Sequence, residues 1–206
     1  MKRRLFVDMD GTLAVFKKIA SLEELYEKDY FLNLEPHMNV VDAVKRIALG
    51  NNDIEVYIMS SVLTDSKYAL EEKNAWLDKY LPEIDGSHRI FPPCGEDKKE
   101  YVPGMILPSD RLLDDYTKNL LLWEPPARGI KLINGINNTN GTWKKDCLDY
   151  RRSGEELANN IVEIIKYGRQ IRDGAVSATL NGEQPGNEVR HEAKPRITEV
   201  KRSYEL

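Results

Sequence analysis

Short apolar runs alternate with longer amphipathic stretches along most of this chain. The short runs favour buried β-strands and cover residues 5–7, 54–59, 88–91, 112–113 and 130–133. The longer stretches place apolar residues at helical spacing and cover residues 40–48, 66–80 and 154–167. Because strands separated by helices form parallel crossovers, the pattern predicts an α/β fold with a doubly wound, mainly parallel Rossmann-like sheet.

Two carboxylates follow the first predicted strand. Asp8 and Asp10 stand two residues apart, directly before Gly11. Side chains alternate along a strand, so both carboxylates can face one site at the carboxyl edge of the sheet, where such folds bind ligands. Two acids this close repel each other unless a cation or a shared proton relieves them. The motif therefore indicates a Mg²⁺ site; the alternative is a strand-to-turn junction in which Asp and Gly serve only turn chemistry.

Further polar groups follow the later strands. In chain order they are the hydroxyls of Ser60 and Ser61, the ammonium groups of Lys98 and Lys99, and the carboxylates of Asp114 and Asp115. Each has an ordinary alternative: the serines can simply end a strand, either lysine can be a surface charge, and one of the acids can cap a short helix at 117–122. Capping would account for one acid of the pair and leave the other unexplained.

This order of acids, hydroxyl, lysine and second acid pair resembles the four-motif pattern of the haloacid-dehalogenase-like phosphohydrolases. Residues 8–16, DMDGTLAVF, look like the opening of the 5′(3′)-deoxyribonucleotidase family, and residues 112–120, LLDDYTKNL, look like its bacterial and phage-type members. The similarity spans roughly residues 4–167. One departure is Val62, which stands where that family carries the proline of a Thr-Ser-Pro sequence.

The resemblance implies a reaction through a covalent intermediate. Asp8 would attack phosphorus and become an aspartyl-phosphate, and Asp10 would act as general acid and then as general base. Carboxylate and phosphate are both anions, and each pair of unit charges at ~4 Å opposes attack by about 4 kcal/mol at an effective dielectric near 20. A Mg²⁺ ion would offset that repulsion, bound by Asp8, the Asp10 backbone carbonyl and one or both of Asp114 and Asp115.

The resemblance also implies groups that hold the phosphoryl oxygens. Ser60 would donate a hydrogen bond to the transferring group, with Ser61 assisting. Lys98 is preferred to Lys99 as the phosphate-binding lysine because its spacing from Gly95 fits the family better.

The segment between the first strand and the next core helix is expected to form a small helical cap over the site, at about residues 14–38. Ser21 and Glu24 have the spacing of a capping box that opens a helix to about Tyr30. Phe16 matches by position an aromatic residue with which the family contacts the base. The alternative, packing between cap and core, is as good for Phe16 and is favoured for Tyr30 and Phe31.

Composition narrows the class of protein further. The formal net charge of −4 argues against strong nucleic-acid binding, which needs a basic face. No apolar run approaches the ~20 residues of a membrane span. Cys94 and Cys147 are too few for a disulfide framework, and the short apolar run after the basic N-terminus meets Asp8 at once, so we expect a cytoplasmic protein.

Residues 168–206 are poor in large apolar residues and rich in Gly, Asn, Glu and Arg. We expect residues 1–167 to form the core domain and 168–206 a peripheral or flexible tail, which is also a candidate for packing on a second subunit of a homodimer.

Together these features predict a Mg²⁺-dependent phosphomonoesterase that acts on nucleoside 5′-monophosphates, with deoxyribonucleotides preferred. One alternative is a phosphatase for another small phosphoester, such as a sugar phosphate or a terminal nucleic-acid phosphate. The other is a nucleotide-binding protein without turnover. The intact acid set argues against the latter, because a binding module gains little from clustered negative charge.

Overall fold

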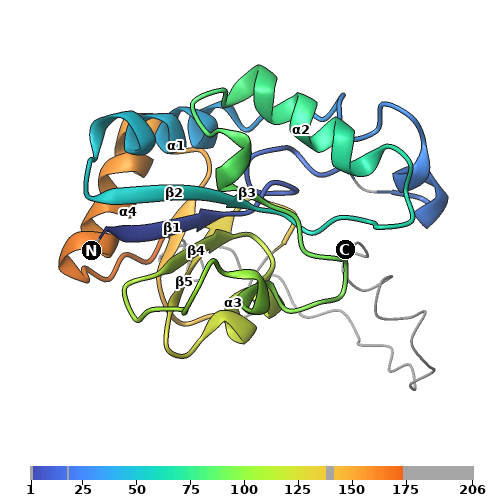
Figure 1. Cartoon of the computed structure of the whole chain (residues 1–206). Helices are drawn as coiled ribbons and strands as arrows, with labels where there is room; N and C mark the ends of the chain where they lie inside the picture. The colour runs from blue at the N-terminus through green and yellow to red at the C-terminus, as the bar shows by residue number, and fades with distance from the viewer. Residues whose placement is uncertain (1, 18, 138–141, 174–206) are drawn as a thin grey trace, which may run out of the picture.

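A computed structural model describes residues 2–17, 19–137 and 142–173 of the chain. Its centre is a six-stranded, fully parallel sheet with the strand order β3-β2-β1-β4-β5-β6 (Figure 1). The strands are β1 Arg3–Val7, β2 Ile54–Met59, β3 Arg89–Ile90, β4 Arg111–Asp114, β5 Arg128–Ile133 and β6 Cys147–Asp149. The predicted α/β, doubly wound class is confirmed.

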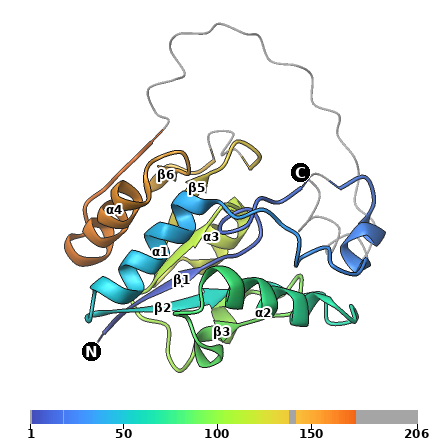
Figure 2. The same ribbon diagram turned by 90° about the horizontal axis from the view of Figure 1, so that it is seen from above.

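Helices cover both faces of this sheet. They are α1 Met38–Gly50, α2 Ala69–Tyr80, α3 Thr117–Trp123 and α4 Gly154–Tyr167, with single 3₁₀ turns η1 Leu22–Tyr26, η2 Gly86–His88 and η3 Lys98–Tyr101. Figures 1 and 2 show α1 and α2 on one side of the sheet and α3 on the other, with α1 and α4 side by side. None of the described helices combines the length and apolar character needed to cross a bilayer.

Side-chain alternation along β1 explains the two layers. Leu5 and Val7 join the larger apolar cluster, with α1, α2 and α4, whereas Phe6 joins the smaller one beside α3 and contacts the Trp123 ring at 5.2 Å. Because both faces are covered, the strands read as nearly continuous apolar runs, which is how the sequence revealed them.

Most element bounds agree with the pattern to within two residues, and three elements differ more. The helix expected from Ser21 to about Tyr30 is only the 3₁₀ turn η1, although Glu24 still accepts the Ser21 N–H as a capping box would. Helix α2 starts at Ala69 because the Ser66 hydroxyl accepts the N–H of Ala69. Strand β6 was not predicted, since three residues are too few for alternation to show.

The sheet has a topological switch point between β1 and β4. From β1 the chain proceeds to β2 and β3 on one side, then crosses back to β4 and continues to β5 and β6 on the other. The loops that follow β1 and β4 therefore diverge and leave a crevice at their carboxyl ends, the usual ligand position in such sheets. Asp8 directly follows β1, and Asp114 ends β4.

The segment expected as a cap, residues 14–38, leaves the core at this edge and returns to it (Figure 2). Its two ends are joined by an antiparallel bridge between Ala14 and Pro36. The Val15 N–H donates to the Glu35 carbonyl at 2.7 Å, which closes the segment into a loop with a fixed base.

The chain beyond α4 continues on the sheet edge. The Cys147 N–H donates to the Ile171 carbonyl at 2.8 Å, and the Asp173 N–H donates to the Cys147 carbonyl at 3.0 Å. The Asp173 carboxylate also pairs with Arg152. Residues 171–173 therefore contact the sheet beyond the expected core boundary at 167. The rest of the expected tail, residues 174–206, lies outside the described residues.

Candidate active site

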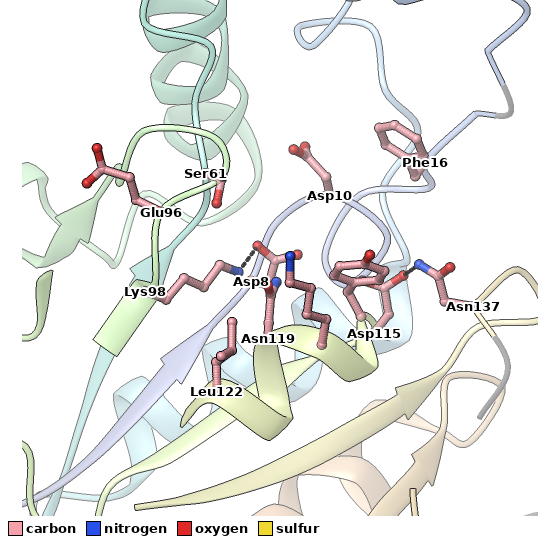
Figure 3. A pocket seen from close by; sticks show the side chains of 13 residues that line it. Asp8, Asp10, Phe16, Ser61, Glu96, Lys98, Asp115, Asn119, Leu122 and Asn137 are labelled. Atoms are coloured by element: carbon pink, nitrogen blue, oxygen red, sulfur yellow. Dashed lines mark hydrogen bonds and ion pairs between the residues drawn. The ribbon is translucent and has the colours of Figure 1, made fainter. Parts of the chain in front are cut away.

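A pocket opens at the carboxyl edge of the sheet, beside the ends of β1 and β4 (Figure 3). It is lined by residues that follow β1 and β4, by the Gly95–Lys98 loop and by one face of α3. The lining residues are Asp8, Asp10, Phe16, Ser61, Gly95, Glu96, Lys98, Asp115, Tyr116, Lys118, Asn119, Leu122 and Asn137.

Three carboxylates converge at the bottom of this crevice. Val7 and Leu113 are partners in the parallel register, so the acids that follow them lie next to each other. The Asp8 N–H continues the pairing by donating to the Leu113 carbonyl at 2.9 Å. Asp8, Asp114 and Asp115 are buried, and their nearest ligand oxygens all lie within 4.8 Å of one another. The parallel sheet thus brings together acids more than a hundred residues apart.

Lys98 enters the same cluster. Its Nζ donates to Asp8 Oδ1 at 2.6 Å and to Asp114 Oδ2 at 2.7 Å, and Figure 3 shows the Lys98 and Asp8 side chains pointing toward one another. Burial lowers the pKa of Lys98, but the charges of Asp114 and Asp8 outweigh it, so the net pKa is raised and the group is an ammonium ion. Lys99 contacts the Pro125 carbonyl outside the pocket. Of the two candidate lysines, the structure brings Lys98 to the acids.

The acids are poorly compensated without a further cation. Burial raises the pKa of Asp8; Lys98 opposes this, while Asp114, Asp10 and Asp115 add to it. Burial and the neighbouring Asp114 raise the pKa of Asp115 to about 6. Carboxylate oxygens of this kind are the ligands that Mg²⁺ prefers. The donor set and its excess negative charge therefore fit a bound Mg²⁺ ion.

Asp115 is held by neutral side chains, two of which donate to its carboxylate and one of which accepts its backbone N–H. Asn134 and Asn137 donate to Asp115 Oδ2 at 2.8 and 2.6 Å, and the Asp115 N–H donates to the Thr12 hydroxyl at 3.1 Å. Gly11 lies directly against it with φ of +82°, and a Cβ there would stand 2.3 Å from Asp115 Oδ2. The glycine of the first motif is thus required both by its backbone conformation and by the close approach of the acid.

Asp114 is fixed by its own loop. Its Oδ1 accepts the Tyr116 N–H at 2.7 Å, and its Oδ2 accepts the Asn119 amide at 2.9 Å. The alternative in which an acid of this pair caps the following helix is wrong, because the N-cap of α3 is Tyr116 and no side chain caps it. The Asp114 carboxylate instead contacts Lys98 and Asn119, next to Asp8.

Lys73 is a site residue that the sequence patterns did not single out for chemistry. It is fully buried, and its Nζ donates to Asp10 Oδ2 at 2.6 Å, to the Ser60 hydroxyl at 3.0 Å and to the Ser61 carbonyl at 2.5 Å. The available signal was its position: Lys73 stands on the apolar stripe of α2 with Trp76 and Leu77, where a charge is unexpected.

The two serines occupy different environments. Ser60 is fully buried, and its hydroxyl accepts from Lys73 beneath the pocket surface. Ser61 lines the pocket, on the same side as Glu96 in Figure 3. Of the two hydroxyls expected to hold a ligand, the one of Ser61 is therefore the better placed.

The aromatic candidates divide in the same way. Phe16 lines the pocket beside Asp10 (Figure 3). Phe31 is 1% exposed and packs against the Tyr30 ring at 5.0 Å, and neither of these two residues lines the pocket. Their position agrees with the packing alternative favoured for them by the sequence.

Most of the chain matches a known protein family. A family model described as "5′ nucleotidase, deoxy (Pyrimidine), cytosolic type C protein" matches residues 21–145, more than half of the sequence. The matched range contains Ser61, Lys73, Lys98 and the 114/115 acid pair, and it begins after the first acid motif.

Individual relatives agree with that family. Curated proteins from two strains of Staphylococcus epidermidis, both named "Putative 5′(3′)-deoxyribonucleotidase", are 28% identical over 103 residues, or 50% of this chain and 50% of each relative. The match thus spans about half the length of these relatives. A solved structure of D,D-heptose 1,7-bisphosphate phosphatase from Burkholderia thailandensis superposes with a TM-score of 0.51 and 12% identity, covering 78% of this chain and 99% of that one. The likeness supports the fold.

Proposed function

We propose that this chain, which belongs to the family of deoxyribonucleotide-type 5′-nucleotidases within the haloacid-dehalogenase-like superfamily, is a Mg²⁺-dependent phosphomonoesterase acting on nucleoside 5′-monophosphates. Deoxyribonucleotides are the preferred substrates in this proposal, because the matching family model and the named relatives are described as deoxyribonucleotidases. The cytoplasmic location expected from the sequence stays a prediction, supported by the word "cytosolic" in the family description.

One observation carries the proposal: acids from the ends of two neighbouring strands meet around a single lysine. Asp8 and Asp114 both contact the Lys98 ammonium, and Asp115 lies within reach of the same ion site. A purely structural cluster would hardly keep three buried carboxylates beside one ammonium, because each unpaired charge is costly to bury.

The contacts of each acid indicate its role in the proposed reaction. Asp8, Asp114 and Asp115 would hold Mg²⁺, which when bound neutralises negative charge and orients the phosphoryl group. An Asp8 oxygen would attack phosphorus while the ester P–O bond breaks, and Asp10 would give its proton to the departing oxygen. Asp10 would then take a proton from the water that hydrolyses the aspartyl-phosphate, which releases phosphate and restores Asp8.

The surrounding donors would bind the phosphoryl oxygens. Lys98 offers a compact positive charge at the bottom of the pocket, and the Ser61 hydroxyl faces the same space. The Asp10 carboxylate is held by Lys73 through Oδ2, while its buried Oδ1 has no hydrogen-bond partner in the described part of the chain. That free oxygen is the one available for proton transfer.

The test is a panel of nucleoside monophosphates and sugar phosphates assayed for released phosphate, with Mg²⁺ and with EDTA. We expect Mg²⁺-dependent release that is fastest with a deoxyribonucleoside 5′-monophosphate. Asp8→Asn should lower kcat by at least about 10³-fold while circular dichroism stays that of the wild type, because the amide cannot act as the nucleophile. Asp149→Asn, at the far edge of the sheet, is the matched control and should keep wild-type activity.

Three results would contradict the proposal. Full activity in EDTA would exclude the metal, and appreciable turnover by Asp8→Asn would remove Asp8 as nucleophile. A preference for a sugar phosphate over every nucleotide would favour the other small-phosphoester class.

A further inference from the structure

Helix α2 carries two adjacent buried charges that face different parts of the molecule. Glu72 is 6% exposed and Lys73 fully buried. Lys73 contacts Asp10 and the β2 end, as described above. Glu72 instead reaches the segment expected as the cap, where its Oε1 accepts the Asp29 N–H at 2.5 Å and its Oε2 accepts the Phe31 N–H at 3.0 Å.

The cap backbone is shaped to meet this carboxylate. Asp29 has φ of +65°, the one positive φ of a non-glycine residue among those described. Such a conformation is unfavourable for a residue with a side chain and persists where its surroundings hold it. The two N–H groups that flank Tyr30 converge on the two oxygens of Glu72, so the carboxylate bridges them as a bidentate acceptor.

The same turn places an aromatic ring over the neighbouring lysine. The Lys73 Nζ lies 4.7 Å from the centroid of the Phe31 ring. All three donor positions of this ammonium are used, by Asp10, Ser60 and the Ser61 carbonyl, and the ring covers it from the cap side. The Phe31 backbone is therefore bound by Glu72 while its ring covers Lys73, which in turn holds Asp10.

We propose that Glu72 is a positioning residue that couples the cap to the proton-transferring Asp10, through Phe31 and Lys73. This inference rests on the proposed function, since it assigns Asp10 the role of general acid. When the cap turn is seated on Glu72, the ring shields Lys73 and fixes its ammonium on Asp10 Oδ2, which leaves Oδ1 without a hydrogen-bond partner among the described residues and free for proton transfer. When the turn is released, Lys73 gains water as a competitor and the carboxyl group loses its fixed orientation.

A second hydrogen bond also holds the cap segment on helix α2. The Trp76 indole N–H donates to the Leu34 carbonyl at 2.7 Å, one helical turn beyond Glu72. Helix α2 thus binds the returning part of the cap independently, so loss of the Glu72 contact should release the 29–31 turn without freeing the whole segment.

The test uses the dependence of the rate on the leaving group. Phenyl phosphate and 4-nitrophenyl phosphate have similar shapes, but the nitrophenolate leaves readily without protonation and phenolate does not. Glu72→Gln keeps the size of the side chain, but its NH₂ group faces one of the two N–H donors. We expect kcat/KM of this variant to fall about 10–100-fold for phenyl phosphate, because a positioned general acid contributes ~10²–10⁴-fold. For 4-nitrophenyl phosphate, which needs no general acid, kcat/KM should stay within about threefold of the wild-type value.

The neighbouring Glu71→Gln is the matched control, because it removes the same charge from an exposed position of the same helix turn. It should leave both rate constants at the wild-type level. Amide hydrogen exchange gives a readout without catalysis: exchange at 29–31 should be faster in Glu72→Gln and unchanged in Glu71→Gln.

Equal losses on the two substrates by a folded Glu72→Gln protein would overturn the coupling, as would unchanged rates together with faster exchange. If that variant does not fold, Glu72→Asp provides the same comparison, with a shorter acid in place of the amide. Failure of the wild type to release phosphate from nucleoside monophosphates as well as from these esters would instead refute the proposed function, so the two failures are distinguishable.

Discussion

Gly11→Ala is the sharpest test of how the first motif and the second acid pair depend on each other. Gly11 has φ of +82°, and an added Cβ would lie 2.3 Å from Asp115 Oδ2, where ordinary contacts begin at 3.4 Å. The carboxylate would therefore have to move by about 1 Å. It cannot do so freely, because Asn134 and Asn137 hold the same oxygen.

The expected effects follow from the positive φ at Gly11 and from the displacement of the Asp115 carboxylate. The left-handed backbone destabilises alanine by about 1–2 kcal/mol relative to glycine. For a chain of this size that lowers Tm by about 2–8 °C. A misplacement of about 1 Å at a reacting site lowers the rate on the order of 10²-fold, and a displaced metal ligand weakens Mg²⁺ binding by about 10–100-fold.

The assay compares Gly11→Ala with Gly104→Ala. Gly104 has φ of +70°, and a Cβ added to it would meet nothing within 4 Å, so this control carries the backbone strain without the clash. Tm should fall in both proteins. Phosphatase activity and Mg²⁺ affinity, measured by calorimetry, should fall in Gly11→Ala alone. Wild-type Mg²⁺ affinity and activity in a folded Gly11→Ala protein would refute the reasoning.

Two further predictions concern stability. Burial lowers the pKa of His37 at the start of α1, so the folded protein protonates this side chain less readily than the unfolded chain, which takes up a proton below pH ~6.5. Stability should therefore fall as the pH drops from 7 to 5. The difference in Tm between wild type and His37→Gln should change over that range, and a constant difference would contradict the prediction. A chain ending at Tyr167 should be less stable than one ending at Asp173 by about 3 kcal/mol, at about 1 kcal/mol for each of the three backbone N–H groups that pair between residues 171–173 and residues 146–147. Both chains keep the pocket residues and should keep phosphatase activity. Equal Tm values for the two chains would show that the segment adds nothing to the core.

The sequence was most informative where local pattern and chemistry coincide. The bounds of β2 and α4 agree with those expected, because one is a compact apolar run and the other has a capping box at Ser153 and a left-handed glycine at 168. The Asp-x-Asp-Gly motif and the 114/115 pair could be assigned to strand ends for the same reason. Strand β6 was missed because three residues carry no readable period. At η1 the capping box at Ser21 is present, but only one 3₁₀ turn follows it in place of the expected helix.

What the sequence determined by itself is the class of fold, the family, and the groups that could form a site. Only the tertiary structure decided which of these groups meet: Lys98 rather than Lys99 among the acids, Ser61 rather than Ser60 on the pocket wall, and Lys73 on Asp10. The physical reason is that strand order and register set the distances between residues far apart in the chain. A short stretch of sequence determines neither of them. The role of Lys73, a buried lysine on the apolar face of α2, could be assigned only once the structure showed that it contacts Asp10.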